Sequence, residues 1–243
     1  MHPLDASPDL GERTWETTGA PLLLVPLGST EQHGPHLPLA TDALVAQAVA
    51  EELRALCAAD GTDTVVGPLL AYGASGEHEG FPGTISIGTE ALVAVLVELG
   101  RSASAWAPRL VVVNGHGGNV EALRRAIPLL RAEGRDAAWL PCSPGPQDRP
   151  ADLHAGWVET SLVARIAPGL VRGDRATAGD TRAPAELLPD LRRQGVRAIA
   201  PNGVLGDPAG ADADHGAALL ADMVRGARDR LARGRVDDGG MLT

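Results

Sequence analysis

The sequence predicts an α/β fold of three layers, α/β/α, with a mainly parallel central sheet. Two observations predict it. First, five short aliphatic runs alternate along the chain with stretches in which apolar residues recur at helical spacing. Second, the short runs are apolar throughout and do not alternate with polar residues, which is typical of strands that helices cover on both faces.

Each predicted element has its own signal along the chain. We expect strands at 21–27, 64–70, 84–88, 109–115 and 136–141. Between them, apolar residues three and four positions apart predict helices over 45–56, 92–106 and 120–130. Pro128 is expected to bend or shorten the third of these helices. A final helix is predicted from about Ala211 to Leu231.

The chain of 243 residues is expected to form a single domain over 1–243. The loop 141–152, rich in Pro, Gly and Asp, would be the natural boundary if there were two domains. The part that follows this loop has strand character only at 196–200, which is too little for a core of its own. The tail 235–243 is expected to be frayed and disordered.

Composition excludes several classes of partner. The formal net charge is −10 and the sequence contains no basic run, so we expect binding neither to nucleic acid nor to anionic membrane surfaces. No apolar run approaches the length of about 18 residues that a membrane span needs, and the first residues do not resemble a secretory signal. Cys57 and Cys142 lie far apart without a CxxC motif. These features predict a cytoplasmic protein.

Carboxylates and imidazoles are crowded into the stretch "GSTEQHGPHLPLATD", residues 28–42, directly after the first predicted strand. In an extended segment Glu31 and His33 project to the same side, whereas Gln32 points elsewhere. Asp42 follows at the start of a helical pattern, from where its carboxylate could return to the same point. Taken alone, Asp42 is more typical of a helix cap, and the pair Glu31 and His33 of a solvated loop.

Two further clusters favour a common site over these simpler interpretations. The apolar run at 109–113 ends in Asn114, Gly115 and His116. The glycines at 115, 117 and 118 have no side chains, so a ligand can come close to the backbone there. Ligands of open α/β sheets bind at the carboxyl ends of the strands. The third cluster, residues 152–161, holds His154 and Glu159. Alone, His154 could be a surface histidine, and Glu159 could compensate a helix dipole.

Together the segments "GSTEQHGPHLP…TD", "NGHGGN" and "HAGWVET" resemble the creatininase family of metal-dependent amidohydrolases, in matching order and over nearly the whole chain. The resemblance implies a creatininase-like fold. Further segments, among them "YGASGEHEGFPGTISIGTEAL" and "PNGVLGDP", are similar to the mycofactocin-system branch of that family. That branch acts as a peptidase in redox-cofactor biosynthesis. It removes the modified carboxyl-terminal Val-Tyr-derived dipeptide from a precursor peptide, which would be the partner and substrate here.

The resemblance implies two divalent metal ions per subunit, with Zn, Fe(II) and Mn as candidates for mixed His and carboxylate ligation. It places Glu31, Asp42 and His116 on one ion, and His33 and Asp42 on the other, so that Asp42 bridges them. Two such ions can activate a water and polarise an amide carbonyl. The resemblance also implies a homo-oligomer, in the family often a hexamer.

One position departs from the family pattern. Creatininase carries a Glu two residues after the histidine of "NGH" as a ligand of the second metal, where this chain has Gly118. We expect Glu159 to supply the missing carboxylate, with Asp152 as the reserve.

Other residues are expected to act around the metals. His154 is predicted to carry the proton in catalysis, together with Glu159 as a catalytic group. His36 is expected to support a neighbour by hydrogen bonding and not to bind metal. The residues expected to line the substrate pocket are Trp157, Asn119, Phe81 and His78.

Two alternatives to the peptidase remain. One is an amidohydrolase of small cyclic amides or formamides, the other chemistry of the family. The second is a metal-binding scaffold that holds the precursor peptide without cutting it. The presence of His154 argues against this alternative, because a scaffold would not need a residue that transfers protons. Product formation separates an enzyme from a scaffold.

Overall fold

The computed structural model describes residues 7–149 and 152–243. Within these ranges the strands form one parallel sheet of four, in the order β2–β1–β3–β4. The strands are β1 (Leu22–Leu27), β2 (Thr64–Val66), β3 (Arg109–Asn114) and β4 (Ala137–Pro141). The central strands β1 and β3 pair from Leu22 with Arg109 to Leu27 with Asn114. Their carboxyl ends therefore lie side by side.

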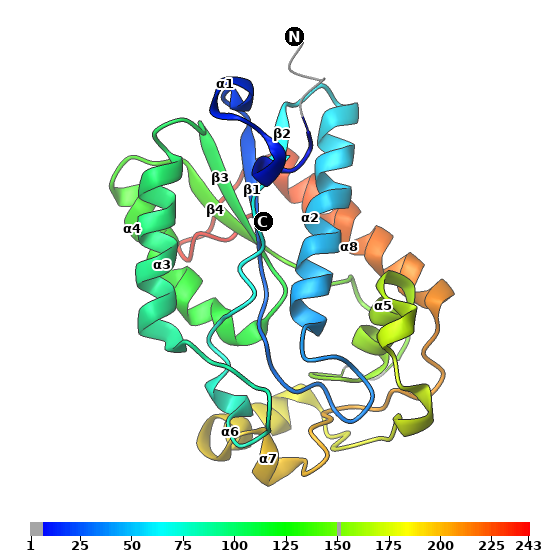
Figure 1. Cartoon of the computed structure of the whole chain (residues 1–243). Helices are drawn as coiled ribbons and strands as arrows, with labels where there is room; N and C mark the ends of the chain where they lie inside the picture. The colour runs from blue at the N-terminus through cyan, green and yellow to red at the C-terminus, as the bar shows by residue number, and fades with distance from the viewer. Residues whose placement is uncertain (1–6, 150–151) are drawn as a thin grey trace.

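Helices cover both faces of the sheet (Figure 1). One face carries α2 (Thr41–Ala59), α5 (Trp157–Ile166) and α8 (Ala213–Arg233), and the other carries α3 (Gly88–Ala103) and α4 (Val120–Ala132). This arrangement confirms the predicted α/β/α layers with a parallel sheet. The helix α4 continues through Pro128 to Ala132, so that the proline does not end it.

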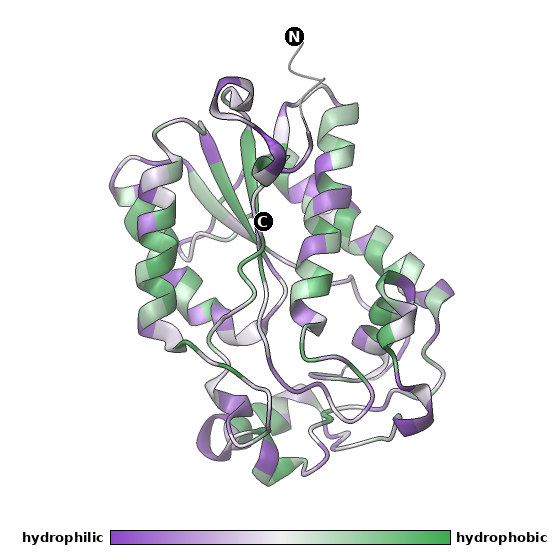
Figure 2. Ribbon diagram, viewed as in Figure 1, coloured by the Kyte–Doolittle hydropathy of each residue, from purple (hydrophilic) through white to green (hydrophobic). Residues whose placement is uncertain are grey.

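Alternation along the strands divides the core between the two helical layers. In β3, Val111 and Val113 belong to the cluster that includes Leu53 of α2, whereas Val112 belongs to the cluster that includes Leu92 of α3. Because both sets of side chains are buried, the strands are almost uniformly apolar, as their green colour in Figure 2 shows.

Smaller elements complete the chain. The short helix α1 (Trp15–Thr18) precedes the sheet, and α6 (Pro184–Gln194) and α7 (Val196–Ile199) lie at the end of the molecule toward which the strands run (Figure 1). Single 3-10 turns lie at Leu10–Glu12, Gly76–His78, Gly117–Asn119, Pro168–Leu170 and Gly173–Arg175. No helix in the described ranges combines the length and the hydropathy needed to cross a bilayer.

One predicted strand is wrong, one is shorter than expected, and the stretch with strand character at 196–200 is helical over most of its length. Residues 84–88 form only an isolated antiparallel bridge between Ile85 and Thr30, away from the sheet. Residues 196–199 form α7, whose residues pack on α6 and have no neighbouring strand to pair with. The strand predicted at 64–70 ends at Val66. The Gly67 N–H still donates to the Leu24 carbonyl, but the next hydrogen bond to β1 comes from the Leu70 N–H to the Pro26 carbonyl, so this segment has one residue more than β1 between the two bonds and the regular ladder is lost.

The tail 235–243 is ordered, contrary to the prediction. The Trp139 N–H donates to the Gly240 carbonyl at 3.0 Å, and the Leu242 N–H donates to the Trp139 carbonyl at 2.9 Å. Leu242 is fully buried in the core. The reason is the free edge of β4, whose backbone groups need partners and find them in the tail.

Candidate metal centre

The first turn of α2 packs directly on the ends of the two central strands. A Cβ atom at Gly28, which follows β1, would lie 2.4 Å from the Cα of Ala43, and one at Gly115, which follows β3, would lie 2.4 Å from the carbonyl oxygen of Asp42. Only glycine at both strand ends permits this approach. The consequence is that Asp42 lies between the loops that follow β1 and β3.

Asp42 is not a helix cap. The N-cap of α2 is Ala40, which makes no side-chain cap hydrogen bond, and the Asp42 carboxylate is buried beside two imidazoles. Its Oδ1 lies 3.2 Å from Nε2 of His33, and its Oδ2 lies 3.1 Å from Nδ1 of His116. The hydroxyl of Ser29 donates to the same Oδ2 at 2.6 Å. The two oxygens of one carboxylate thus face two different histidines.

Backbone carbonyls fix which nitrogen of each ring is free. Nδ1 of His33 lies 3.1 Å from the carbonyl of Glu31, and Nε2 of His116 lies 3.1 Å from the carbonyl of Ala74. Because a carbonyl can only accept, each of these nitrogens carries a hydrogen. The opposite nitrogens, those that face Asp42, are the ones with a lone pair available for a metal.

His154 is held in the same way. Its Nε2 lies 2.7 Å from the carbonyl of Gln32 and must donate to it, which leaves Nδ1 free, 3.8 Å from Oε1 of Glu31. Glu159, in the first turn of α5, places Oε2 3.7 Å from Nε2 of His33 and accepts the N–H of Ala155 at 2.6 Å.

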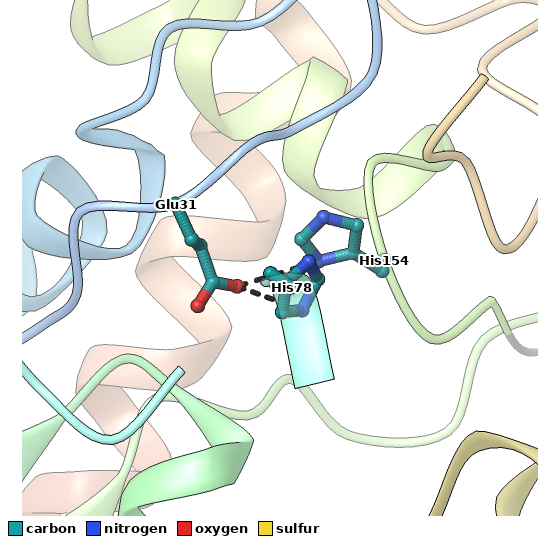
Figure 3. A group of neighbouring side chains, drawn as sticks. All are labelled: Glu31, His78 and His154. Carbon is teal, nitrogen blue, oxygen red and sulfur yellow. Dashed lines mark ion pairs between the residues drawn. The ribbon is translucent and has the colours of Figure 1, made fainter. Parts of the chain in front are cut away.

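Glu31 is a buried carboxylate whose two oxygens have no hydrogen-bond partner in the described residues. Oε1 lies 3.1 Å from Nε2 of His78 and Oε2 lies 3.2 Å from Nε2 of His116, and neither contact is a hydrogen bond. Figure 3 shows Glu31, His78 and His154 converging on one point. A buried carboxylate without a hydrogen-bond donor is unfavourable, and a bound cation would satisfy it.

Three overlapping groups of side chains bring their ligand atoms within 4.8 Å of one another. We call Glu31, Asp42 and His116 the inner group, because all three are buried, and His33, His154 and Glu159 the outer group, because Glu159 is partly exposed. The third group is Glu31, His78 and His154. The five residues predicted as ligands are thus brought together: Glu31, His33, Asp42, His116 and Glu159.

The buried carboxylates and imidazoles of the cluster shift one another's pKa. Burial alone would lower the pKa of His33 and of His116, but the neighbouring carboxylates raise each to about 10: mainly Asp42 and Glu159 for His33, and Glu31 and Asp42 for His116. Burial raises the pKa of Glu31 and of Glu159 to about 7. These carboxylates and imidazoles suit a divalent transition metal, which would replace the protons.

The other two rings of the cluster are neutral. Burial, and then the charges of His33 and His78, hold the pKa of His154 well below its ordinary value. Burial and the charge of His116 lower the pKa of His78 to about 3. Both shifts favour the neutral imidazole, which is the form that binds a metal.

A cavity of about 720 Å³ opens onto this cluster. Asp42, His116, His154 and Glu159 form one wall, and Leu188, Leu191, Arg192 and Arg193 of α6 form another. Its volume is within the range of ligand pockets, which run from about 300 to 1,000 Å³. A second cavity of about 430 Å³ lies beside it and shares Leu153 and Glu159 as lining residues.

The four residues predicted to line the pocket lie in different places. His78 lines the larger cavity and Trp157 the smaller one. Asn119 is fully buried, and its amide is used in hydrogen bonds to the Ala74 N–H, the Gly28 carbonyl and Oδ1 of Asn114, so the expectation that it faces substrate is wrong. Phe81 packs instead against the apolar cluster of α6 and α7.

The supporting residues are partly as predicted. His36 is buried and its Nε2 lies 2.9 Å from the hydroxyl of Thr160, next to Glu159, which agrees with a supporting role. Asp152, the reserve ligand, belongs to none of the three groups. Its carboxylate accepts the N–H of Trp157 at 2.5 Å and that of Val158 at 3.4 Å, and so caps α5.

Sequence reasoning left three polar residues of the centre without a role. Gln32, expected to point elsewhere, is buried with its amide nitrogen 2.9 Å from Nδ1 of His78 and 3.0 Å from Nε2 of His154. Ser29 donates to Asp42, and Glu77 lies 3.5 Å from Nε2 of His116. The available signal was adjacency, because each of the three lies within two positions of another polar residue of the cluster.

Comparisons with known proteins agree with this geometry. Residues 6–231 match the family described as "Creatininase: Creatinine amidohydrolase". A "Mycofactocin precursor peptide peptidase" of Mycolicibacterium smegmatis is 55% identical over 224 residues, which are 92% of this chain and 89% of that protein. The protein of the same name from Mycobacterium tuberculosis is 53% identical over 230 residues, 92% of this chain and 90% of that one. A mutant creatininase of "Zn-Zn type" superposes with a TM-score of 0.75 at 27% identity, covering 94% of this chain and 98% of that chain. The chain belongs to the creatininase family of amidohydrolases.

Proposed function

We propose that the protein is a metal-dependent peptidase that cleaves the modified carboxyl-terminal Val-Tyr-derived dipeptide from the mycofactocin precursor peptide. The single observation that carries the hydrolytic part of this proposal is Asp42, whose two oxygens face the free nitrogens of His33 and His116. Such a carboxylate is placed to bridge two metal ions. The choice of substrate is supported by relatives of that name, which match this chain over most of its length.

Two divalent ions per subunit are part of the proposal. The inner group would hold one ion, and His33 with Glu159 would hold the other, with Asp42 shared between them. When bound, such ions lower the pKa of a water molecule and polarise the amide carbonyl. The donor set is compatible with Zn, Fe(II) and Mn, and one structural relative is of Zn-Zn type.

The remaining steps are assigned to this chain's own side chains. Nδ1 of His154 has a free lone pair and lines the cavity, so it would take a proton from the attacking water and deliver it to the departing amine nitrogen. Its Nε2–H stays on the Gln32 carbonyl, which keeps the ring oriented during both transfers. Glu159, which also lines the cavity, would be the second catalytic group through the metal ion that it helps to hold.

The cavity supports a peptide in preference to a small cyclic amide. Its volume of about 720 Å³ exceeds what a ring of a few atoms would fill, and it extends from the cluster to α6.

Family membership also leads us to propose a homo-oligomer, such as a hexamer, in the cytoplasm. Light scattering on the purified protein tests the assembly state.

The deciding experiment is mass spectrometry of the modified, decarboxylated precursor peptide after incubation with the protein, with and without a chelator, alongside elemental analysis of bound metal. We expect a short carboxyl-terminal fragment whose release stops on chelation and resumes when metal is restored. An intact peptide with two metals per chain would instead support the small-amide alternative, and creatinine and formamides would be tested next. A peptide that binds but stays intact, with those amides also uncut, would support the scaffold.

A further inference from the structure

We propose that Glu77 is a positioning residue that orients His116 in the metal centre and occupies the space that a side chain at position 118 would take. The proposal rests on the proposed metal centre. It concerns the position where this chain departs from the creatininase pattern, Gly118.

The space beside Gly118 is filled by a different loop. A Cβ atom at position 118 would lie 2.3 Å from the Ala74 carbonyl oxygen, 2.4 Å from Nε2 of His116 and 2.6 Å from Oε1 of Glu77. The first of these contacts is with backbone and cannot be relieved by a side-chain rotation. The loop that carries Ala74 and Glu77 therefore requires glycine at 118, and it delivers a carboxylate to the same place.

Within the described ranges, the only ion-pair contact of Glu77 is with His116. Its Oε1 lies 3.5 Å from Nε2 of His116, and no other charged or hydrogen-bonding partner of its side chain lies within those ranges. The residue lies in the 3-10 turn Gly76–His78, one position before the buried His78, and it lines the larger cavity. Its side chain is 28% exposed, so the carboxylate reaches the cluster from the cavity side.

The side of the ring that Glu77 approaches defines its role. Nε2 of His116 carries the hydrogen, because it faces the Ala74 carbonyl, and Nδ1 faces Asp42. A carboxylate on the N–H side holds the ring in this tautomer and increases the basicity of the opposite nitrogen. Carboxylates commonly support metal-binding histidines in this way. Glu77 would therefore act through His116 and would not itself touch the metal.

The test compares Glu77→Gln and Glu77→Asp with Glu79→Gln, an exposed glutamate of the same loop. Zinc affinity is measured by competition with a chromogenic chelator, and the cobalt(II)-loaded proteins are compared by their visible absorption spectra. We expect Glu77→Gln to weaken zinc binding about 10- to 100-fold and to change the cobalt spectrum. Glu77→Asp, which keeps the charge, should lose less, and Glu79→Gln should bind zinc like the unmodified protein.

The outcomes separate this inference from the proposed function. If the unmodified protein binds zinc and Glu77→Gln binds it with the same affinity and cobalt spectrum, Glu77 does not position His116, and the peptidase proposal stands. If the unmodified protein binds no zinc, the metal centre itself fails. If Glu77→Gln does not fold, Glu77→Asp decides the question, and unchanged zinc affinity with an unchanged cobalt spectrum in that variant would overturn the inference.

Discussion

The inner and outer groups of the metal centre differ in burial more than in what positions them. Each group has a carboxylate in the first turn of a helix, Asp42 in α2 and Glu159 in α5. Each also has a ligand in the segment between β1 and α2, Glu31 or His33. All three residues of the inner group are buried, whereas Glu159 of the outer group is partly exposed and lines the cavity. The outer group is therefore the more accessible of the two.

The variant with the largest expected effect removes Asp42, the residue that contacts both groups. Asp42→Ala removes the carboxylate that faces both His33 and His116, so we expect loss of both metals and of all measurable turnover. Elemental analysis and the peptide assay check this, with circular dichroism as the control for an intact helical fold. Unchanged metal stoichiometry in this variant would contradict the bridging assignment.

The next variant separates the two groups. Glu159→Gln changes only the outer group, so we expect one metal per chain to remain while the other is lost or weakly bound. The matched control is Asp152→Asn, a carboxylate a few residues away that caps α5 and belongs to no ligand group. Loss of both metals from Glu159→Gln would show that the groups are not independent.

His154 distinguishes chemistry from metal binding within the outer group. For His154→Ala we expect retained metal and a turnover lower by at least about 10²-fold, because removing a general acid or base typically costs about 10²- to 10⁴-fold. Stopped assays with the precursor peptide, normalised to bound metal, measure this. A turnover near that of the unmodified protein removes His154 from the mechanism, whereas loss of one metal makes it a ligand.

The pH dependence of metal binding is expected to be the same for both groups. Each contains one carboxylate whose pKa is raised to about 7 and lies next to an imidazole whose pKa is raised to about 10. Metal can bind only when these groups release their protons, so affinity should fall as pH decreases below about 10, where the imidazoles take up protons, and more steeply below about 7, where the carboxylates do so as well. Equilibrium dialysis across pH 5 to about 9 tests it. Affinity that rises on acidification would contradict the assignment.

The smallest expected effect concerns the loop of the outer group. Asp152→Ala removes the cap of α5, so we expect a loss of about 0.5–2 kcal/mol in unfolding free energy with both metals retained. Urea denaturation measures this, and unchanged stability would mean that the cap does not hold the loop.

The sequence was sufficient for the layers of the fold and for the polar clusters that the structure brings together. Strands buried on both faces leave uniformly apolar runs, and ligands that follow strand ends appear as short polar clusters, as with Glu31 and His116. What could not be predicted depends on contacts distant along the chain. The amide of Asn119 is used by Gly28 and Ala74, and whether 84–88 forms a strand depends on a neighbour that it lacks.

The carboxyl-terminal tail has a consequence for solubility. By pairing Gly240 and Leu242 with Trp139, it occupies the exposed edge of β4, where another copy of the chain could otherwise add a strand. A variant that lacks residues 239–243 would leave these backbone groups open and uncover the core beneath Leu242. The tail thus covers the edge of the sheet at Trp139 and leaves fewer open backbone groups there for a second copy of the chain.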